Sequence, residues 1–393
     1  MVHPRRDQAA FFVMLAVLGA MVVVPFLMPA DPPPAESERY LGQGTHHRKA
    51  PAPGAQANTP SGSESEDTET GESRKGQHGH DLPETAPHWY LTVHGGDDLA
   101  DVFALDAKGR VIGGILGKLP AGIQPLKELR GISLLGDGRL AVVNAFMQNS
   151  RVYVYGAPDA QGMRPFASTW VAGGPQNPGF MHPYQIAVGP NGSLYASNQD
   201  SNTVTRYYGL GSPQAGNPYP VPSMLQEFGT LPAGIVVPNS QHSPEGIHEV
   251  RGIAFGPDGL LYVADRSGHQ VLKWDTATGR MMGVVMSAAQ GLGQPIQLLF
   301  TPDRQSLLIG DNLKEHNCVW KLNLATGKAE MLVKTGAGGL NMPSALAIDG
   351  SHLYVGSRVG QSILKFNLAD GTFVGEFAKL KGNPEFLIPV QQK

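Results

Sequence analysis

Histidine, arginine and glutamate residues stand together just ahead of several apolar, strand-like segments. His182 precedes PYQIAV, and His248 lies between Glu245 and Glu249, shortly before Arg251. Imidazole beside carboxylate can bind zinc or another divalent metal, although no histidine pair here has the spacing of a zinc motif. Arginine presents a planar fork of donors that suits a carboxylate. These residue types therefore indicate either a metal site or a site for an anionic ligand, if the fold brings them together.

A repeated pattern of short strands must position these residues. The segment Val250–Arg280, VRGIAFGPDGLLYVADRSGHQVLKWDTATGR, alternates apolar runs with Pro-Asp-Gly, polar and Thr-Gly turns. Related segments begin at Leu129, Pro183, Ile296 and Ser344. A unit of four short strands that recurs at roughly 40–50 residues is typical of a β-propeller blade, which buries its faces only against its neighbours.

Alignment of the copies gives six blades, and therefore an all-β, six-bladed propeller, with seven blades as the alternative. The first copy, Trp89–Leu116, supplies three strands only, and the segment Asn383–Val390 supplies the missing innermost strand. Such closure by the two ends of the domain removes exposed sheet edges. The other copies are Leu129–Ala172, His182–Leu231, Val250–Met286, Gln294–Val333 and Met342–Leu380.

Two sets of residues recur at equivalent positions in the aligned blades. The first is a polar column at the end of each second strand, for which we predict side-chain bonding to the backbone. The second lies where each innermost strand begins, at the channel mouth. The polar column is Asn144, Asn198, Asp265, Asp311 and Ser357. The mouth residues are Arg130, Tyr184, Arg251, Ile296, Ser344 and Glu385, with Gln185 and Gln297 one residue deeper.

The mouth residues allow two interpretations. Two arginines and a tyrosine at one end of a channel suit an anionic or carboxylate ligand. Alternatively, Arg130 or Arg251 pairs with Glu385 and fills the channel. In both cases most histidines of the propeller, including His182 and His248, are predicted on loops of the mouth face. These two histidines are the candidates for a metal.

The segment GIAFGPDGLLYVADRSGHQV resembles an NHL-type repeat, and the resemblance covers most of Trp89–Val390. Related propellers include binding modules, peptide-amidating lyases, virginiamycin lyases and calcium-dependent lactonases of the gluconolactonase and paraoxonase type. The lactonases place Glu, Asn and Asp at the mouth, whereas this chain offers Glu385 and the weaker candidate Ser344. The amidating lyases place zinc-binding histidines there, and this chain has none at those positions. The resemblance therefore implies a ligand- or protein-binding module, with a metal-dependent lyase or hydrolase as the alternative.

The first 87 residues differ in composition from the repeats. Residues 1–8 carry Arg5 and Arg6, and residues 9–30 are apolar and uncharged, long enough to cross a bilayer core of about 30 Å. We expect a single-pass membrane anchor or, if cleaved, a signal peptide, with the remainder outside the cytoplasm or secreted. Residues 31–87 are rich in Pro, Ser, Gly and charge and are expected to form a disordered linker to the propeller at 88–393.

The net charge, the single cysteine, a glycosylation sequon and a Pro-rich insert give weaker information about function. A net charge of −3 gives no reason to propose nucleic acid as a partner, since a nucleic-acid binder needs a basic face. Cys318 is the only cysteine, so no disulfide can form within the chain. Asn191 begins an Asn-Gly-Ser glycosylation sequon, and the Pro-rich insert Gly209–Pro222 is predicted on the face opposite the mouth.

Overall fold

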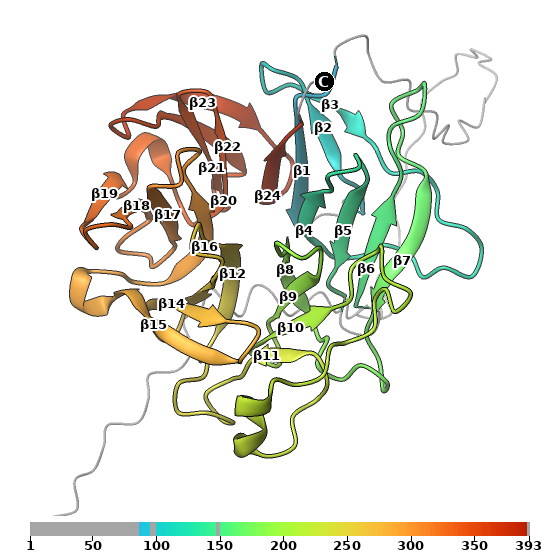
Figure 1. Ribbon diagram of the computed structural model, residues 1–393. Coiled ribbons are helices and arrows are strands. Elements are labelled where there is room, and N and C mark those ends of the chain that lie inside the picture. Colours follow the sequence, from blue (N-terminus) through green and yellow to red (C-terminus); the bar gives the residue numbers. More distant parts are fainter. Residues whose placement is uncertain (1–85, 95–99, 147–149, 391–393) are drawn as a thin grey trace, which may run out of the picture. The chain divides into compact units, whose positions relative to one another are not determined.

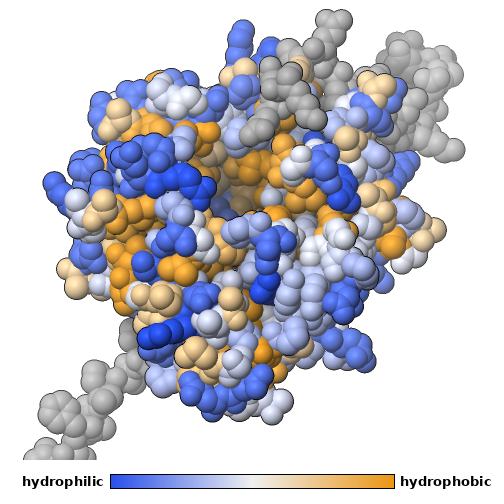
Figure 2. Space-filling model, in the orientation of Figure 1, coloured by the Kyte–Doolittle hydropathy of each residue, from blue (hydrophilic) through white to orange (hydrophobic). Residues whose placement is uncertain are grey.

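The structure is a computed structural model that describes residues 86–94, 100–146 and 150–390. Within these residues, six antiparallel sheets of four strands stand around a common axis, each forming one blade (Figure 1). The predicted six-bladed propeller is therefore confirmed. The face seen in Figure 2 is hollowed near the centre of the ring, and apolar side chains surround the hollow.

The blades are numbered along the chain, and each runs from the axis outward. Blades 1 to 3 consist of β24 (Asn383–Pro389), β1 (Trp89–His94), β2 (Phe103–Leu105) and β3 (Val111–Gly114); β4 (Leu129–Leu134), β5 (Leu140–Asn144), β6 (Arg151–Tyr155) and β7 (Phe166–Ala172); and β8 (Pro183–Val188), β9 (Leu194–Asn198), β10 (Thr203–Tyr207) and β11 (Ile235–Val237).

Blades 4 to 6 follow the same order without interruption. They consist of β12 (Val250–Phe255), β13 (Leu261–Asp265), β14 (Gln270–Asp275) and β15 (Arg280–Ser287); β16 (Pro295–Phe300), β17 (Ser306–Asp311), β18 (Cys318–Asn323) and β19 (Ala329–Val333); and β20 (Pro343–Asp349), β21 (His352–Ser357), β22 (Ser362–Asn367) and β23 (Phe373–Lys379).

The second strand of each blade is buried on both faces because every blade lies between two others. In β5, LAVVN, and β13, LYVAD, every residue is buried. Such strands appear in the sequence as continuous apolar runs rather than alternating ones. The single cysteine, Cys318, is also buried, at the start of the third strand of blade 5, and burial raises the pKa of its thiol.

The ring is closed by the last strand, as predicted. β24 pairs with β1 in antiparallel register from Trp89–Pro389 to His94–Asn383, so the C-terminal strand is the innermost strand of blade 1 (Figure 1). Blade 1 thus receives strands from both ends of the domain, and each of the six described blades has four strands.

Blade 3 is longer than the sequence alignment indicates. The predicted copy ends at Leu231, but the fourth strand, β11, follows at Ile235–Val237. The Pro-rich insert and the 3₁₀-helix η3 (Ser223–Phe228) come between β10 and β11. The prediction stopped short because the apolar segment of β11 is only three residues long. The insert contacts the β8–β9 turn, where a side chain at Gly209 would collide with the carbonyl of Gly192, and this turn lies opposite the mouth as predicted.

Four of the five polar-column residues bind the backbone of the loop that enters their blade, as predicted. The Asn144 side chain accepts hydrogen bonds from the backbone N–H groups of Lys127 and Glu128, and Asp265 accepts from His248 and Glu249. Asp311 holds Gly293 and Gln294 in the same way, and Ser357 holds Asn341. Asn198 departs from the pattern, because its side-chain amide donates to Thr205 within its own blade.

No helix in the described part of the chain is long and apolar enough to cross a membrane. The predicted anchor at 9–30 and the linker at 31–87 lie outside the described residues, apart from the last two linker positions.

Candidate functional site

A register shift in every innermost strand marks the mouth of the ring. The pairing of β4 with β5 shifts between Leu129 and Ile132, and the pairing of β12 with β13 shifts between Val250 and Ile253. The other four innermost strands shift at the equivalent place. A bulge of this kind re-aims the side chain that it carries. The six predicted mouth residues all lie at these irregularities, so they form one structural set.

Glu128, directly before β4, has one arginine and two histidines around a single carboxylate oxygen. Its Oε1 lies 2.8 Å from Arg130 Nη2, 3.1 Å from His182 Nε2 and 3.6 Å from His94 Nε2. The other ring nitrogen of His182 lies 2.9 Å from Asp200. Burial favours the neutral acid, but the hydrogen bonds from His182 and His94 and the charge of Arg130 outweigh it and hold the pKa of Glu128 well below its ordinary value.

Glu385, in β24, is fully buried between two arginines from the neighbouring blades. One of its oxygens lies 3.1 Å from Arg130 Nη1 of blade 2, and the other lies 3.0 Å from Arg358 Nη1 of blade 6. The predicted pairing of Arg130 with Glu385 is therefore present. Together with Arg358, this pair connects blades 6, 1 and 2 at the place where the ring closes.

A second charged cluster, in blade 4, repeats the sequence pattern of the first. Glu249 precedes β12, as Glu128 precedes β4, and each glutamate accepts a hydrogen bond from the arginine two residues later. Glu249 Oε1 also lies 2.9 Å from Arg266 Nη1, and its second oxygen accepts from Ser267. One carboxylate thus serves the guanidinium groups of both Arg251 and Arg266.

The charge of Arg251 is less well balanced by its neighbours than the charge of Arg130. Burial, together with repulsion from Arg266 and Arg130, lowers the pKa of Arg251 in spite of Glu249. For Arg130, the attraction of Glu385 and Glu128 exceeds the cost of burial, and its pKa is raised. The balance of charge therefore differs between the two clusters, and an added anion would relieve Arg251 more than Arg130.

Tyr184 lies between the two clusters and has an unused hydrogen-bonding group. Its side chain is buried, its hydroxyl has no hydrogen-bond partner within the described residues, and its ring centre lies 5.9 Å from the Arg251 guanidinium carbon. Burial raises its pKa to about 12, with Glu385 acting in the same direction and the mouth arginines against it. The Nε of Arg130 is likewise buried without a partner among the described residues. Both groups are buried donors, and Glu385 beside them likewise has carboxylate oxygens that accept no hydrogen bond among the described residues.

An apolar contact crosses the axis at the level of Tyr184. Tyr184 of blade 3, Ile296 of blade 5 and Phe386 of blade 1 belong to one buried cluster, whose other members all come from blades 1 and 2. Because no residue of blades 4 or 6 takes part, Ile296 reaches the cluster across the axis. The Tyr184 and Phe386 rings lie 5.2 Å apart. The charged groups therefore surround an apolar centre.

The remaining predicted ligand-binding candidates make structural contacts. Gln185 Oε1 accepts a hydrogen bond from the backbone N–H of Ile253, 3.0 Å away in the next blade. Ser344 Oγ donates to the carbonyl of Pro384 at 2.6 Å. Gln297 is buried, and its Oε1 has no hydrogen-bond partner among the described residues. These contacts place Gln185 and Ser344 at the boundaries between blades.

The two predicted metal candidates are held by different partners. His182 belongs to the Glu128 cluster, whereas His248 is half exposed and lies 3.1 Å from the buried Asp265. Within residues 86–94, 100–146 and 150–390, no three His, Cys, Asp or Glu side chains are grouped to hold a metal ion. The metal-dependent alternative therefore stays a prediction. Asn191, the glycosylation candidate, is exposed in the β8–β9 turn.

Sequence reasoning missed three charged members of the mouth: Glu128, Arg266 and Arg358. Arg266 and Arg358 directly follow polar-column residues, and their backbone N–H groups donate to Glu249 and Met342, the residues before β12 and β20. This bond brings each arginine to the mouth. The available signal was a repeated pentapeptide, Glu-Leu-Arg-Gly-Ile at 128–132 and Glu-Val-Arg-Gly-Ile at 249–253.

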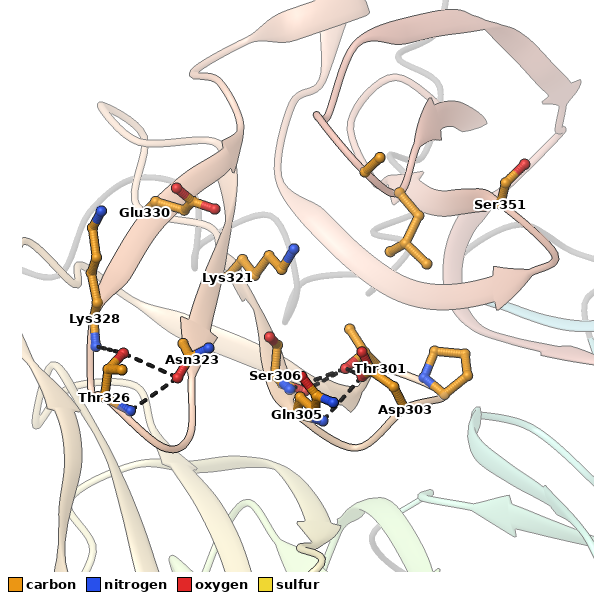
Figure 3. A pocket seen from close by; sticks show the side chains of 13 residues that line it. Thr301, Asp303, Gln305, Ser306, Lys321, Asn323, Thr326, Lys328, Glu330 and Ser351 are labelled. Atoms are coloured by element: carbon orange, nitrogen blue, oxygen red, sulfur yellow. Dashed lines mark hydrogen bonds between the residues drawn. The ribbon is translucent and has the colours of Figure 1, made fainter.

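A separate polar groove of about 650 Å³ lies on the opposite face, between blades 5 and 6 (Figure 3). The β16–β17 and β18–β19 turns form one side, with Lys321 and Lys328 among the lining residues, and Ser351 comes from blade 6. The Thr301 hydroxyl donates to Asp303, and the Thr326 hydroxyl donates to Asn323. These hydroxyl groups are thus already used within their own turns.

Comparison with known proteins identifies the scaffold. No family model matches the sequence, and no curated protein matches it. A solved nidogen/laminin complex contains a chain that is 13% identical, with a TM-score of 0.55 over 78% of this chain and 99% of that chain. A protein of unknown function from Bacteroides caccae is 12% identical, with a TM-score of 0.51 over 78% of this chain and 100% of that chain. At this identity the likeness defines the class alone, a six-bladed β-propeller.

A further solved structure is virginiamycin B lyase from Staphylococcus aureus, in a catalytically inactive form with quinupristin. It is 12% identical, with a TM-score of 0.45 over 76% of this chain and 86% of that chain.

Proposed function

We propose that this propeller is a binding module whose mouth takes a small ligand with a carboxylate or similar anionic head. The observation that carries the proposal is the Tyr184 hydroxyl, which is buried near one carboxylate, Glu385, and the mouth arginines, without a hydrogen-bond partner in the described structure. A buried polar group without a partner costs about 1–3 kcal/mol. A ligand oxygen would remove that cost and would also meet the guanidinium of Arg251.

The electrostatics of the mouth support an anion over a neutral ligand. Arg251 is largely buried and shares its carboxylate partner with Arg266, so its charge is only partly balanced by Glu249. Hydrogen bonds from a guanidinium to a carboxylate are shorter and stronger than those between neutral groups. The fold is compatible with this role, because one similar solved chain is part of a protein complex.

Calorimetric titration of the purified full-length chain tests the proposal. We expect acetate to bind and acetamide, its uncharged analogue, to release no heat of binding. Arg251→Lys keeps the charge but loses the planar fork, and it should weaken acetate binding about tenfold. Arg110→Lys is the matched control, because Arg110 lies in the exposed β2–β3 turn, where it pairs with Asp106. Equal binding of acetate and acetamide, or acetate binding that survives Arg251→Lys unchanged, would contradict the proposal.

We further propose that residues 9–30 anchor the chain in a membrane and that the propeller lies outside the cytoplasm. The support is the uncharged apolar run of this segment and the arginines that precede it. Protease added to intact cells should release a fragment that carries the propeller. Retention of the whole chain inside protease-treated cells, with cleavage only after lysis, would oppose this topology.

A further inference from the structure

We infer that the ligand is a monocarboxylic acid with an apolar body, whose head meets Arg251 and Tyr184 and whose body lies against Ile296. This inference rests on the proposed function and adds the chemical class of the ligand. It follows from the uneven distribution of charge around the mouth, from the apolar contact across the axis, and from the different balance of the two glutamate–arginine clusters.

The mouth residues are divided into a charged side and an uncharged side. Blades 1, 2 and 4 contribute Glu385, Arg130 and Arg251, whereas blades 5 and 6 contribute Ile296 and Ser344. The Ser344 hydroxyl is already used by the carbonyl of Pro384. Neither side chain of blades 5 and 6 therefore offers a free partner for a second acid group. Blade 6 also brings Arg358 to the mouth, but this arginine already binds the second oxygen of Glu385. At blade 4, by contrast, Arg251 and Arg266 share the single carboxylate of Glu249. A ligand that spans the mouth therefore meets an incompletely balanced pair of arginines at one end only.

Exposed apolar side chains also lie at the mouth end of blades 3 and 6. Ile296 is only 4% exposed and meets the Tyr184–Phe386 cluster across the axis. Met181, just before β8, is 44% exposed, and Val359, just after the mouth arginine Arg358, is 56% exposed. Exposed apolar side chains beside a polar centre are a feature of sites that bind partly apolar ligands. The ligand body should therefore be aliphatic or aromatic rather than polar.

The position of the acid head follows from the partners of each arginine. Arg130 contacts two carboxylates, those of Glu128 and Glu385. Arg358 contacts the second oxygen of Glu385. Arg251 contacts Glu249, which Arg266 also binds, and its guanidinium faces the Tyr184 ring. An incoming carboxylate therefore gains most at Arg251, with the Tyr184 hydroxyl as the second donor.

A series of acids tests the inference on the full-length chain by calorimetry. Isovalerate adds three carbons to acetate, and we expect it to bind about fiftyfold more tightly if these carbons are fully removed from water. Isovaleramide should not bind, and succinate should bind no better than acetate. Ile296→Thr should bring the isovalerate affinity to within about twofold of the acetate affinity of the same variant. Ile309→Thr, a buried position in β17 away from the mouth, is the control and should leave the preference intact.

The outcomes separate the inference from the proposed function. Equal affinities for acetate and isovalerate, or a preference for succinate, would overturn the apolar monocarboxylate while leaving an anion-binding mouth. An isovalerate preference that persists in a folded Ile296→Thr protein would overturn the position of the ligand body. Much tighter binding of a peptide with a free C-terminus would overturn the small-molecule class. Failure of every acid to bind would remove the proposed function itself.

Discussion

Arg130 Nη1 lies 3.1 Å from Glu385 Oε2, and this pair joins the second blade to the last strand of the domain. Glu385 is fully buried, and Arg358 approaches its other oxygen from blade 6. Because β24 completes blade 1, the three side chains connect the blades on both sides of the point where the ring closes. The charged residues at the mouth therefore form two groups. Those of blades 6, 1 and 2 hold the ring closed, whereas those of blade 4 form the proposed ligand contact.

Replacement of Glu385 by glutamine should strongly destabilise the propeller. The substitution keeps the shape but leaves Arg130 and Arg358 without the carboxylate that they share. Removal of one partner from a buried ion pair typically costs about 3–5 kcal/mol, because the remaining charge stays buried. Urea unfolding of the full-length chain measures the change. Glu376→Gln, at an exposed position of β23, is the control. A Glu385→Gln protein as stable as this control would show that the ion pair does not hold the ring.

The contribution of His182 to stability should depend on pH. Burial opposes its protonated form, but hydrogen bonds to Glu128 and Asp200 outweigh burial and raise its pKa above the ordinary value of 6.5. A raised folded-state pKa stabilises the protein fully below pH 6.5, and this stabilisation is lost as the pH rises through the folded-state pKa. The free energy of unfolding should therefore fall more between about pH 6 and pH 9 for the native protein than for His182→Gln. Urea unfolding at several pH values measures both, and parallel pH profiles would contradict the assignment.

Glu128 should act in the opposite direction, because its folded-state pKa is lowered. Its stabilisation is present above pH 4.5 and is lost as the pH falls through the folded-state pKa. Glu128→Gln should therefore remove stability at pH 6, where both its carboxylate and the His182 imidazolium are charged. The double variant Glu128→Gln/His182→Gln should be less destabilised than the sum of the two single variants, since the side chains interact directly. Additive effects would show that the contact has no net energy.

The sequence was sufficient for the scaffold because the same physical requirement recurs in each blade. Each second strand is buried on both faces and therefore appears as a continuous apolar run. Each also ends in a polar residue, and four of the five in the column bind an incoming loop. Repetition allowed the strand Asn383–Val390 to be assigned to blade 1, although it is far away in sequence. The position of the mouth residues followed from the same alignment.

The partners within the mouth could not be obtained in this way. The backbone N–H of Arg358 donates to the carbonyl of Met342, and this bond turns the loop after β21 back toward the mouth, where Arg358 contacts Glu385. No local sequence pattern predicts this contact. The alignment also gave Arg130 and Arg251 equivalent places, whereas the structure gives them different partners. Arg130 contacts the strand that closes the ring, β24, whereas Arg251 does not. That difference depends on which residue the neighbouring blade presents, and it is therefore a property of the assembled ring.

Loss of the polar-column carboxylate in blade 4 should loosen the proposed ligand contact without opening the ring. Asp265 is fully buried and accepts hydrogen bonds from the backbone N–H groups of His248, Glu249 and Gly268. Asp265→Ala leaves these donors without a partner, at a cost of about 1–3 kcal/mol. Hydrogen exchange should then increase at residues 248 and 249 and remain slow in β24. Asp265→Asn keeps an acceptor and should be milder. Equal protection of residues 248 and 249 in the native protein and Asp265→Ala would contradict this role.

Removal of the Tyr184 hydroxyl should stabilise the ligand-free protein and weaken ligand binding at the same time. Tyr184→Phe deletes a buried hydroxyl that has no partner within the described structure, so the free energy of unfolding should rise by about 1 kcal/mol. Acetate affinity should fall several-fold, because a donor to the carboxylate is lost. Tyr155→Phe is the matched control, since the Tyr155 hydroxyl is also buried without a partner among the described residues, in β6 of blade 2. Both variants should be more stable, and only Tyr184→Phe should bind acetate less well. A destabilised Tyr184→Phe protein would show that the hydroxyl has a structural partner. Acetate binding as tight as that of Tyr155→Phe would show that the hydroxyl does not contact the ligand. Either result would remove Tyr184 as the second donor of the mouth.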